Sequence, residues 1–151
     1  MAKFVRDSRV EQVYMIMYEH MNGYGRLFGG RLMEWIDMVA GVVARRHSNC
    51  EVTTAAIDQL DFIAPAYIGD TVVLEGCLTH TGRTSMEVRV DTYVEKLCGT
   101  RERINRAYLV MVALDKDGKP APVPALIPET VEEKAEFEAG KRRKKARKHN
   151  Q

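Results

Sequence analysis

The sequence predicts an α+β domain in which an antiparallel sheet curls around one long helix. Two observations support this prediction. Residues 29–44 carry Leu32, Ile36, Val39 and Val43 at helical spacing, so one stripe of that helix faces a core. Segments that read as β-strands lie on both sides of the helix, one before it and four after it. No internal repeat is found, so we expect a single domain.

The elements follow one another in a defined order. A first strand precedes a glycine-rich loop and the helix, and four strands then lead through a turn and a proline-rich crossing into a final helix. The expected bounds are Val10–Tyr18 for the first strand, Glu51–Phe62, Thr71–Thr79, Thr84–Val94 and Arg103–Leu114 for the others, Asp115–Gly118 for the turn, and 129–151 for the final helix. Apolar and charged residues alternate strictly from Met86 to Asp91, which predicts that one face of the sheet is in contact with water.

Composition is that of an ordinary globular domain. The chain has 151 residues, of which 45% are hydrophobic and 29% charged. No apolar run approaches the ~20 residues of a membrane span, and the N-terminus lacks the apolar core of a signal peptide. Three widely spaced cysteines indicate free thiols in a reducing compartment. A cytoplasmic protein is therefore expected.

Asp37 is the first candidate for chemistry. It lies on the rim of the apolar stripe, and three of its four neighbours at helical spacing, Ala40, Gly41 and Ala44, are small. A second backbone or a slender ligand could therefore approach the carboxylate. The alternative is an ordinary surface acid, solvated or paired with a nearby arginine.

The segment before the helix strengthens the functional interpretation. Residues 22–30, Asn-Gly-Tyr-Gly-Arg-Leu-Phe-Gly-Gly, contain four glycines and predict a loop with close backbone approach. This loop leads into the helix N-terminus, where the first N–H groups have no internal partner and the helix dipole is positive. Such donors can hold a polarised carbonyl or an oxyanion.

These residues resemble a known family. The pattern Asn22-x-x-Gly25-x-x-Phe28-Gly29-Gly30-x-x-Met33-x-x-x-Asp37 is similar to the signature of acyl-CoA thioesterases with the hotdog fold, in the branch of bacterial broad-range enzymes and cytosolic long-chain hydrolases of animals. The chain departs from many relatives at Phe28, where they carry His. The similarity continues through Val52–Ala55, Asp61–Pro65, Gly69–Asp70, Thr84–Val88, Pro124–Thr130, Glu133–Lys134 and Phe137–Gly140. It spans about residues 10–148.

The resemblance implies a single hotdog domain over residues 10–128, with an extension at 1–9 and a C-terminal helix at 129–151. It implies hydrolysis of fatty acyl-CoA to a free acid and CoA, without a metal or redox cofactor. Asp37 would be the general base, or less favourably the nucleophile, and Asn22 would orient the water or the thioester. A backbone N–H of Gly29 or Gly30 would face the oxyanion. In the family the site lies between two subunits, so Asn22 and Asp37 would come from different chains of a homodimer, with a hexamer of three dimers expected.

Two further regions have possible roles in binding. The turn residues Arg83, Thr84 and Ser85 are candidates for contact with CoA phosphates. Seven of the 23 basic residues lie between positions 141 and 148, leaving 16 bases against 21 acids elsewhere. Because acids begin this final helix and bases end it, we interpret the basic end as a solvated, dipole-matched helix terminus. Binding of RNA or a membrane by this end is the alternative, whereas a dedicated nucleic-acid surface is not expected.

Other classes of function remain open. Hotdog proteins also include non-catalytic acyl-CoA-binding sensors and hydratases or dehydratases, although the Asp-His pair of the hydratase branch is not found near Asp37. His47-x-x-Cys50 has a spacing seen in metal sites, but no second pair completes a tetrahedral set, so no metal is expected. The sequence contains no Gly-x-Ser-x-Gly elbow and no Walker-type loop, which argues against a serine esterase and a P-loop nucleotidase.

Overall fold

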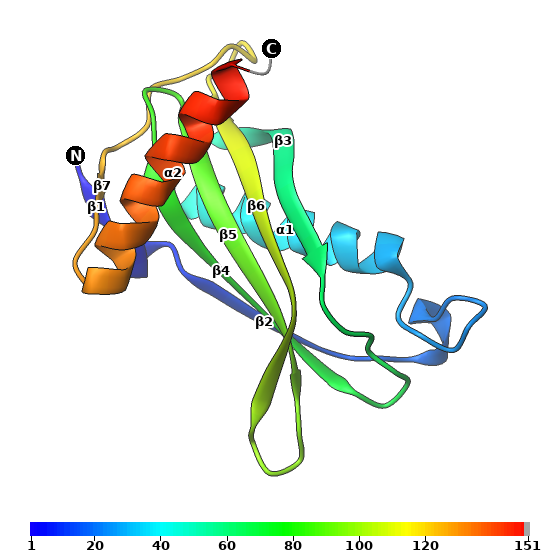
Figure 1. Ribbon diagram of the computed structural model, residues 1–151. Helices are drawn as coiled ribbons and strands as arrows, with labels where there is room; N and C mark the ends of the chain where they lie inside the picture. Colours follow the sequence, from blue (N-terminus) through cyan, green and yellow to red (C-terminus); the bar gives the residue numbers. More distant parts are fainter. Residues whose placement is uncertain (150–151) are drawn as a thin grey trace.

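A five-stranded antiparallel sheet, in the order β2-β4-β5-β6-β3, has one long helix on each face (Figure 1). The computed structural model describes residues 1–149. The strands are β2 (Val10–Met15), β3 (Glu51–Phe62), β4 (Thr71–Thr81), β5 (Ser85–Glu95) and β6 (Arg101–Leu114), and the helices are α1 (Gly29–Ser48) and α2 (Val131–His149). The predicted α+β architecture, with a sheet wrapped around a long helix, is confirmed.

The helix α1 forms the core against the sheet. All four residues of the predicted stripe are buried, with at most 3% of each exposed. The helix runs one turn beyond the predicted stretch, because His47 and Ser48 are also buried. It ends where Asn49 adopts a left-handed conformation at φ 58° and its N–H bonds the carbonyl of Arg45. No helix within residues 1–149 is both long and apolar enough to cross a membrane.

The strand β3 is a long, open edge of the sheet. Its predicted bounds are confirmed, and it pairs with β6 through a ladder that shifts register between Thr54 and Ala56 and between Ile57 and Gln59. Its other edge has no partner strand among the described residues. Most of its side chains are exposed, including Ile57 and Phe62. An unprotected edge of this length is a surface on which another chain can pair.

The structure differs from the sequence prediction at the end of the first strand and in two additional short strands. The first strand stops at Met15 instead of Tyr18, because the following residues form the short 3₁₀ helix η2 (Tyr18–His20), where the Met17 N–H donates to His20 Nδ1 over 2.9 Å. Two short strands not predicted from the sequence, β1 (Lys3–Phe4) and β7 (Leu126–Ile127), pair in parallel. The short 3₁₀ helix η1 (Val5–Asp7) follows β1. Its Val5 is only 1% exposed, so the N-terminal segment packs on the domain.

The prediction that one face of the sheet is in contact with water was wrong. On β5, the side chains of Glu87 and Asp91 are only 2% and 4% exposed. The helix α2 covers this face at close range (Figure 1): a Cβ added at Gly140 would lie 2.7 Å from His80 Cβ. The alternation of β5 therefore reflects a charged layer between sheet and helix, because an acid can be buried when arginines neutralise it.

The interpretation of the basic segment as a solvated helix end was also wrong for two of its residues. Arg143 binds Glu87 with two hydrogen bonds of 2.7 and 3.0 Å, and Arg147 binds Asp58 of β3 over 2.7 Å. Burial and a hydrogen bond to Glu136 in the same layer raise the pKa of Tyr108 to about 12. Exposed bases remain on the outer side of α2, namely Lys141, Arg142, Lys145 and Lys148. The C-terminal helix is thus docked by ion pairs that reach both β5 and β3.

Candidate functional site

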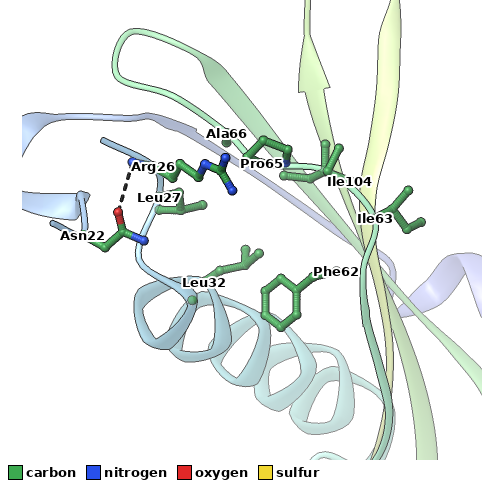
Figure 2. Close-up of a pocket in the computed structure, with 11 residues that line it drawn as sticks. Asn22, Arg26, Leu27, Leu32, Phe62, Ile63, Pro65, Ala66 and Ile104 are labelled. Atoms are coloured by element: carbon green, nitrogen blue, oxygen red, sulfur yellow. Dashed lines mark hydrogen bonds between the residues drawn. The ribbon is translucent and has the colours of Figure 1, made fainter. Parts of the chain in front are cut away.

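The loop before α1 is closed by the side chain of Asn22. Its Oδ1 accepts hydrogen bonds from the N–H groups of Tyr24, over 2.8 Å, and Arg26, over 3.2 Å. The backbone of Asn22 also donates to the carbonyl of Arg26 over 2.7 Å, and Gly25 supplies the positive φ of 76° that the turn requires. The side-chain oxygen is therefore occupied. Asn22 can offer a ligand the donor half of its amide, whose nitrogen points into a cavity (Figure 2).

The start of α1 supplies further donors beside Asn22. The first hydrogen bonds of the helix run from the N–H groups of Arg31 and Leu32 to the carbonyl of Phe28, so the N–H groups of Gly29 and Gly30 precede them. Phe28 occupies the cap position and makes no side-chain capping bond. A Cβ at Gly30 would lie 3.1 Å from the Phe28 ring, whereas one at Gly29 would meet only the edge of Phe62 at 3.8 Å. The N–H groups of Gly29 and Gly30 therefore have no partner within the helix, and they lie where the helix dipole is most positive.

A cavity of about 430 Å³ opens in front of these donors. Asn22, Arg26 and Gly29 line it together with the apolar side chains of Leu32 and Phe62. The remaining lining residues are Leu27, Ile63, Ala64, Pro65, Ala66 and Ile104. An apolar cavity with a few convergent polar groups is the usual form of a ligand site. The structure thus brings Asn22 and Gly29, two of the predicted site residues, to one cavity.

Asp37 lies outside this cavity. It is half-buried on α1, and its Oδ1 accepts a hydrogen bond of 2.6 Å from the hydroxyl of Thr54 on the edge strand β3. Space is open on the adjacent turn, because a Cβ added at Gly41 would meet nothing within 4 Å among the described residues. Within one chain, Asn22 therefore lies at the cavity and Asp37 at the open edge, and the structure does not bring the two side chains together.

Thr54 was missed as a site residue. Sequence reasoning placed it in a matching segment, Val52–Ala55, without giving it a role. A threonine in a strand is unremarkable in itself, and its contact with a helix residue 17 positions away depends on how β3 lies over α1. The sign available in the sequence was its place in the segment shared with the family.

The remaining candidates lie elsewhere. Arg83 and Thr84 lie in the turn between β4 and β5, and Ser85 begins β5 with its Oγ 3.4 Å from Lys144 Nζ of α2. Their contact with CoA stays a prediction. His47 is buried with its Nε2 2.7 Å from the carbonyl of Pro124, and burial lowers its pKa. Residues 1–149 contain no group of three or more His, Cys, Asp or Glu side chains placed to hold a metal ion.

Comparison with known proteins identifies the family. Residues 24–97 match the family model of the thioesterase superfamily. The chain is 41% identical over 133 residues to the uncharacterized acyl-CoA thioester hydrolase YkhA of Bacillus subtilis. The aligned region covers 87% of this chain and 77% of that protein. The chain belongs to the thioesterase superfamily. It is also 37% identical over 142 residues to the cytosolic acyl coenzyme A thioester hydrolase of Rattus norvegicus, covering 92% of this chain but 37% of that longer protein.

Solved structures agree in fold over almost the whole chain. An apo-hexameric acyl-CoA thioesterase is 42% identical with a TM-score of 0.95, over 99% of this chain and 96% of that one. An acyl-CoA hydrolase from Staphylococcus aureus, solved with butyryl coenzyme A, coenzyme A and coenzyme A disulfide, is 30% identical with a TM-score of 0.95, over 99% and 92% of the two chains. The predicted hotdog fold is confirmed for this thioesterase-superfamily chain.

Three structures of the staphylococcal hydrolase carry single alanine replacements. The residues replaced are an asparagine, an aspartate and a threonine. Their separations along that chain, 15 and 17 positions, equal those between Asn22, Asp37 and Thr54 here.

Proposed function

We propose that this protein hydrolyses fatty acyl-CoA thioesters to a free acid and CoA, at sites that each combine Asn22 of one subunit with Asp37 and Thr54 of another. One observation carries the shared site: a hydrogen-bonded acid lies at an open edge, while the cavity with its oxyanion donors lies at the helix start. Each half lacks what the other supplies. The matching trio in the staphylococcal hydrolase supports the choice of residues.

The chemistry follows from what a thioester requires. The carbonyl oxygen accepts hydrogen bonds from the N–H groups of Gly29 and Gly30, which stabilise the negative charge that develops there. The amide nitrogen of Asn22 donates to the water or the thioester and fixes its orientation. Water attacks the carbonyl carbon as its proton passes to Asp37. The tetrahedral intermediate then expels the CoA sulfur, which takes the proton back from Asp37 as it leaves and so regenerates the carboxylate.

Thr54 gives Asp37 a defined geometry in this scheme. Its hydroxyl donates to Oδ1 over 2.6 Å, which leaves Oδ2 without a hydrogen bond among the described residues. A carboxylate held in this way favours water activation over direct attack, because nucleophilic attack requires the carboxylate to approach the carbonyl carbon itself. On this proposal Asp37 acts as the general base. The reaction consumes water and needs no metal or redox cofactor.

The unpaired edge of β3 and the outer side of α1 support a homodimer. Met33 on α1, one turn before Asp37, and Ile57 on β3, the strand that carries Thr54, are exposed apolar side chains. A second copy placed on this surface would cover them and bring its own loop residues toward Asp37. Relatives that form hexamers support a trimer of such dimers, and the cytosolic name of the rat relative supports a cytoplasmic location. Names of relatives as hydrolases favour catalysis over an acyl-CoA sensor or a hydratase.

The primary test is release of free thiol from acyl-CoAs of graded chain length. Hydrolysis of at least part of the series is expected, and the profile reports how much of the cavity the acyl group fills. Binding of every acyl-CoA without thiol release would instead establish a non-catalytic binding protein.

The shared site makes a quantitative prediction for mixed dimers. Asn22→Ala and Asp37→Ala chains should each be nearly inactive as homodimers. Random pairing of equal amounts gives about half heterodimers, each with one intact site of two, so co-refolding should restore roughly a quarter of wild-type activity if sites are independent. Thiol release is the measurement, and differently tagged chains confirm exchange. If exchange is verified and no activity returns, each site is built within one chain.

A further inference from the structure

Arg26 is a charged residue in the wall of an otherwise neutral cavity. The described residues that line this cavity include no acid, and their polar side chains and helix-start N–H groups are donors. Figure 2 shows the Arg26 side chain extending over the cavity, with its guanidinium beside Pro65. A ligand that fills this cavity therefore meets a positive charge on one side.

The position of Arg26 is fixed by the proposed catalytic loop. Its N–H donates to Asn22 Oδ1, and its carbonyl accepts from the Asn22 N–H. On the other side, Arg26 forms an isolated β-bridge with Tyr67. The backbone of Arg26 is thus held between the asparagine that faces the ligand and the segment that forms the far wall. The exposed side chain of Arg26 extends from this fixed backbone and lines the cavity.

Arg26 has no carboxylate partner in the part of the chain that the structure describes, residues 1–149. By contrast, Arg31 on the first turn of α1 binds Glu34 over 3.5 Å and does not line the cavity. Guanidinium groups match the geometry of carboxylates and phosphates and are chosen where such groups are bound. Within one chain, the cavity therefore has a positive side chain that no acid among residues 1–149 neutralises.

We propose that Arg26 binds an oxyanion carried by the substrate and so determines which acyl-CoAs this site prefers. The inference rests on the proposed hydrolase function. The oxyanion is a carboxylate at the far end of a dicarboxylic acyl group or a phosphate of CoA, two sources with one recognition chemistry. A short dicarboxylic acyl group places its second carboxylate only a few bonds from the carbonyl held at Gly29 and Gly30, whereas the pantetheine arm separates the phosphates from it.

The experiment compares three substrates with one acyl length: a plain acyl-CoA, the same acyl-CoA ending in a carboxylate, and the plain acyl-pantetheine, which lacks the phosphates. Arg26→Gln removes the charge, Arg26→Lys keeps it without the planar fork, and Arg31→Gln is the matched control that removes an equal charge nearby. A lost charged hydrogen bond should lower kcat/KM by about 10- to 100-fold for the substrate that uses it.

The pattern of losses identifies the source. If the acyl carboxylate is bound, Arg26→Gln lowers kcat/KM selectively for the carboxylate-ended substrate. If a CoA phosphate is bound, both CoA substrates lose and the acyl-pantetheine does not. In either case Arg26→Lys recovers part of the loss, and Arg31→Gln leaves the ratios between substrates as in the wild type. Equal effects of Arg26→Gln on all three substrates would overturn the proposal.

Equilibrium binding separates this inference from the proposed hydrolysis. Calorimetric titration of CoA, and of a non-hydrolysable thioether analogue of each acyl-CoA, measures the same ratios without turnover. A wild-type protein that binds these compounds and releases no thiol would contradict the hydrolase function, while the Arg26→Gln ratios would still support or overturn the anion site.

Discussion

Replacing Asp37 by Asn should lower kcat by about 100-fold or more while leaving the fold intact. The amide has nearly the shape of the carboxylate and can still accept the hydrogen bond from Thr54 that holds it in place. It cannot take a proton from water, so the loss should fall on kcat, with KM changing less. Thiol release under saturating acyl-CoA measures the effect, and the melting temperature at fixed protein concentration verifies the fold.

Thr54→Val is the graded comparison for this experiment. It removes the 2.6 Å hydrogen bond but leaves the carboxylate, so kcat should fall by about 10-fold, the low end of the range for a hydrogen bond to a charged group. A folded Asp37→Asn protein with near-normal turnover would eliminate Asp37 as the base. A Thr54→Val loss as large as that of Asp37→Asn would instead show that the hydroxyl contacts the reacting atoms.

The second large effect is expected in stability. Glu87→Gln should lower the free energy of unfolding by about 3 kcal/mol, because removing one partner of a buried ion pair leaves the other charge uncompensated. The Glu87 carboxylate is 2% exposed and accepts hydrogen bonds from Thr79 and twice from Arg143. Arg143 keeps a weaker contact with Glu136 over 3.4 Å and stacks on the Tyr108 ring, which limits the cost. Urea denaturation at constant protein concentration gives the difference.

Glu102→Gln is the control for this measurement. Glu102 pairs with Lys96 over 3.9 Å near the tip of the β5–β6 hairpin, where both side chains are more than half exposed. Such a pair contributes at most about 1 kcal/mol. Equal, small effects of the two substitutions would mean that α2 does not depend on the charged layer. Deleting residues 141–151 should also lower the free energy of unfolding, because the deletion removes Arg143, the ion-pair partner of Glu87.

The elements were predictable where one physical pattern dominates. The stripe from Leu32 to Val43 fixes which face of α1 is buried, and the β3 bounds follow from a long β-prone run from Glu51 to Phe62. The pairing of β1 with β7 was not predictable, since each has two residues and the contact joins opposite ends of the chain. The alternation on β5 specifies two faces but not what covers them. The burial of Glu87 depends on a helix more than 40 residues further along.

The candidate site was predictable in its residues and less so in its arrangement. Asn22, Asp37 and the Gly29–Gly30 pair were selected from loop composition, helix geometry and family resemblance. The side-chain oxygen of Asn22 accepts hydrogen bonds from the loop backbone. This contact depends on the turn geometry, which the sequence does not specify. The hydrogen bond between Asp37 and Thr54 depends on the tertiary placement of β3. The position of Arg26 at the cavity was not predicted, because an arginine in a loop is usually solvated.

If copies of the chain pair through the open edge of β3, the activity per subunit depends on the concentration of the protein. In the proposed arrangement a single subunit contributes half of each of two sites and contains no complete site. Dilution that dissociates the dimer therefore separates Asn22 from the Asp37 with which it shares a site. Specific activity would then fall as the enzyme is diluted instead of staying constant. A substrate that touches both chains binds only the assembled form, and by mass action it holds the subunits together. The acyl-CoA supply would thereby regulate how much active enzyme exists as well as how fast each site turns over.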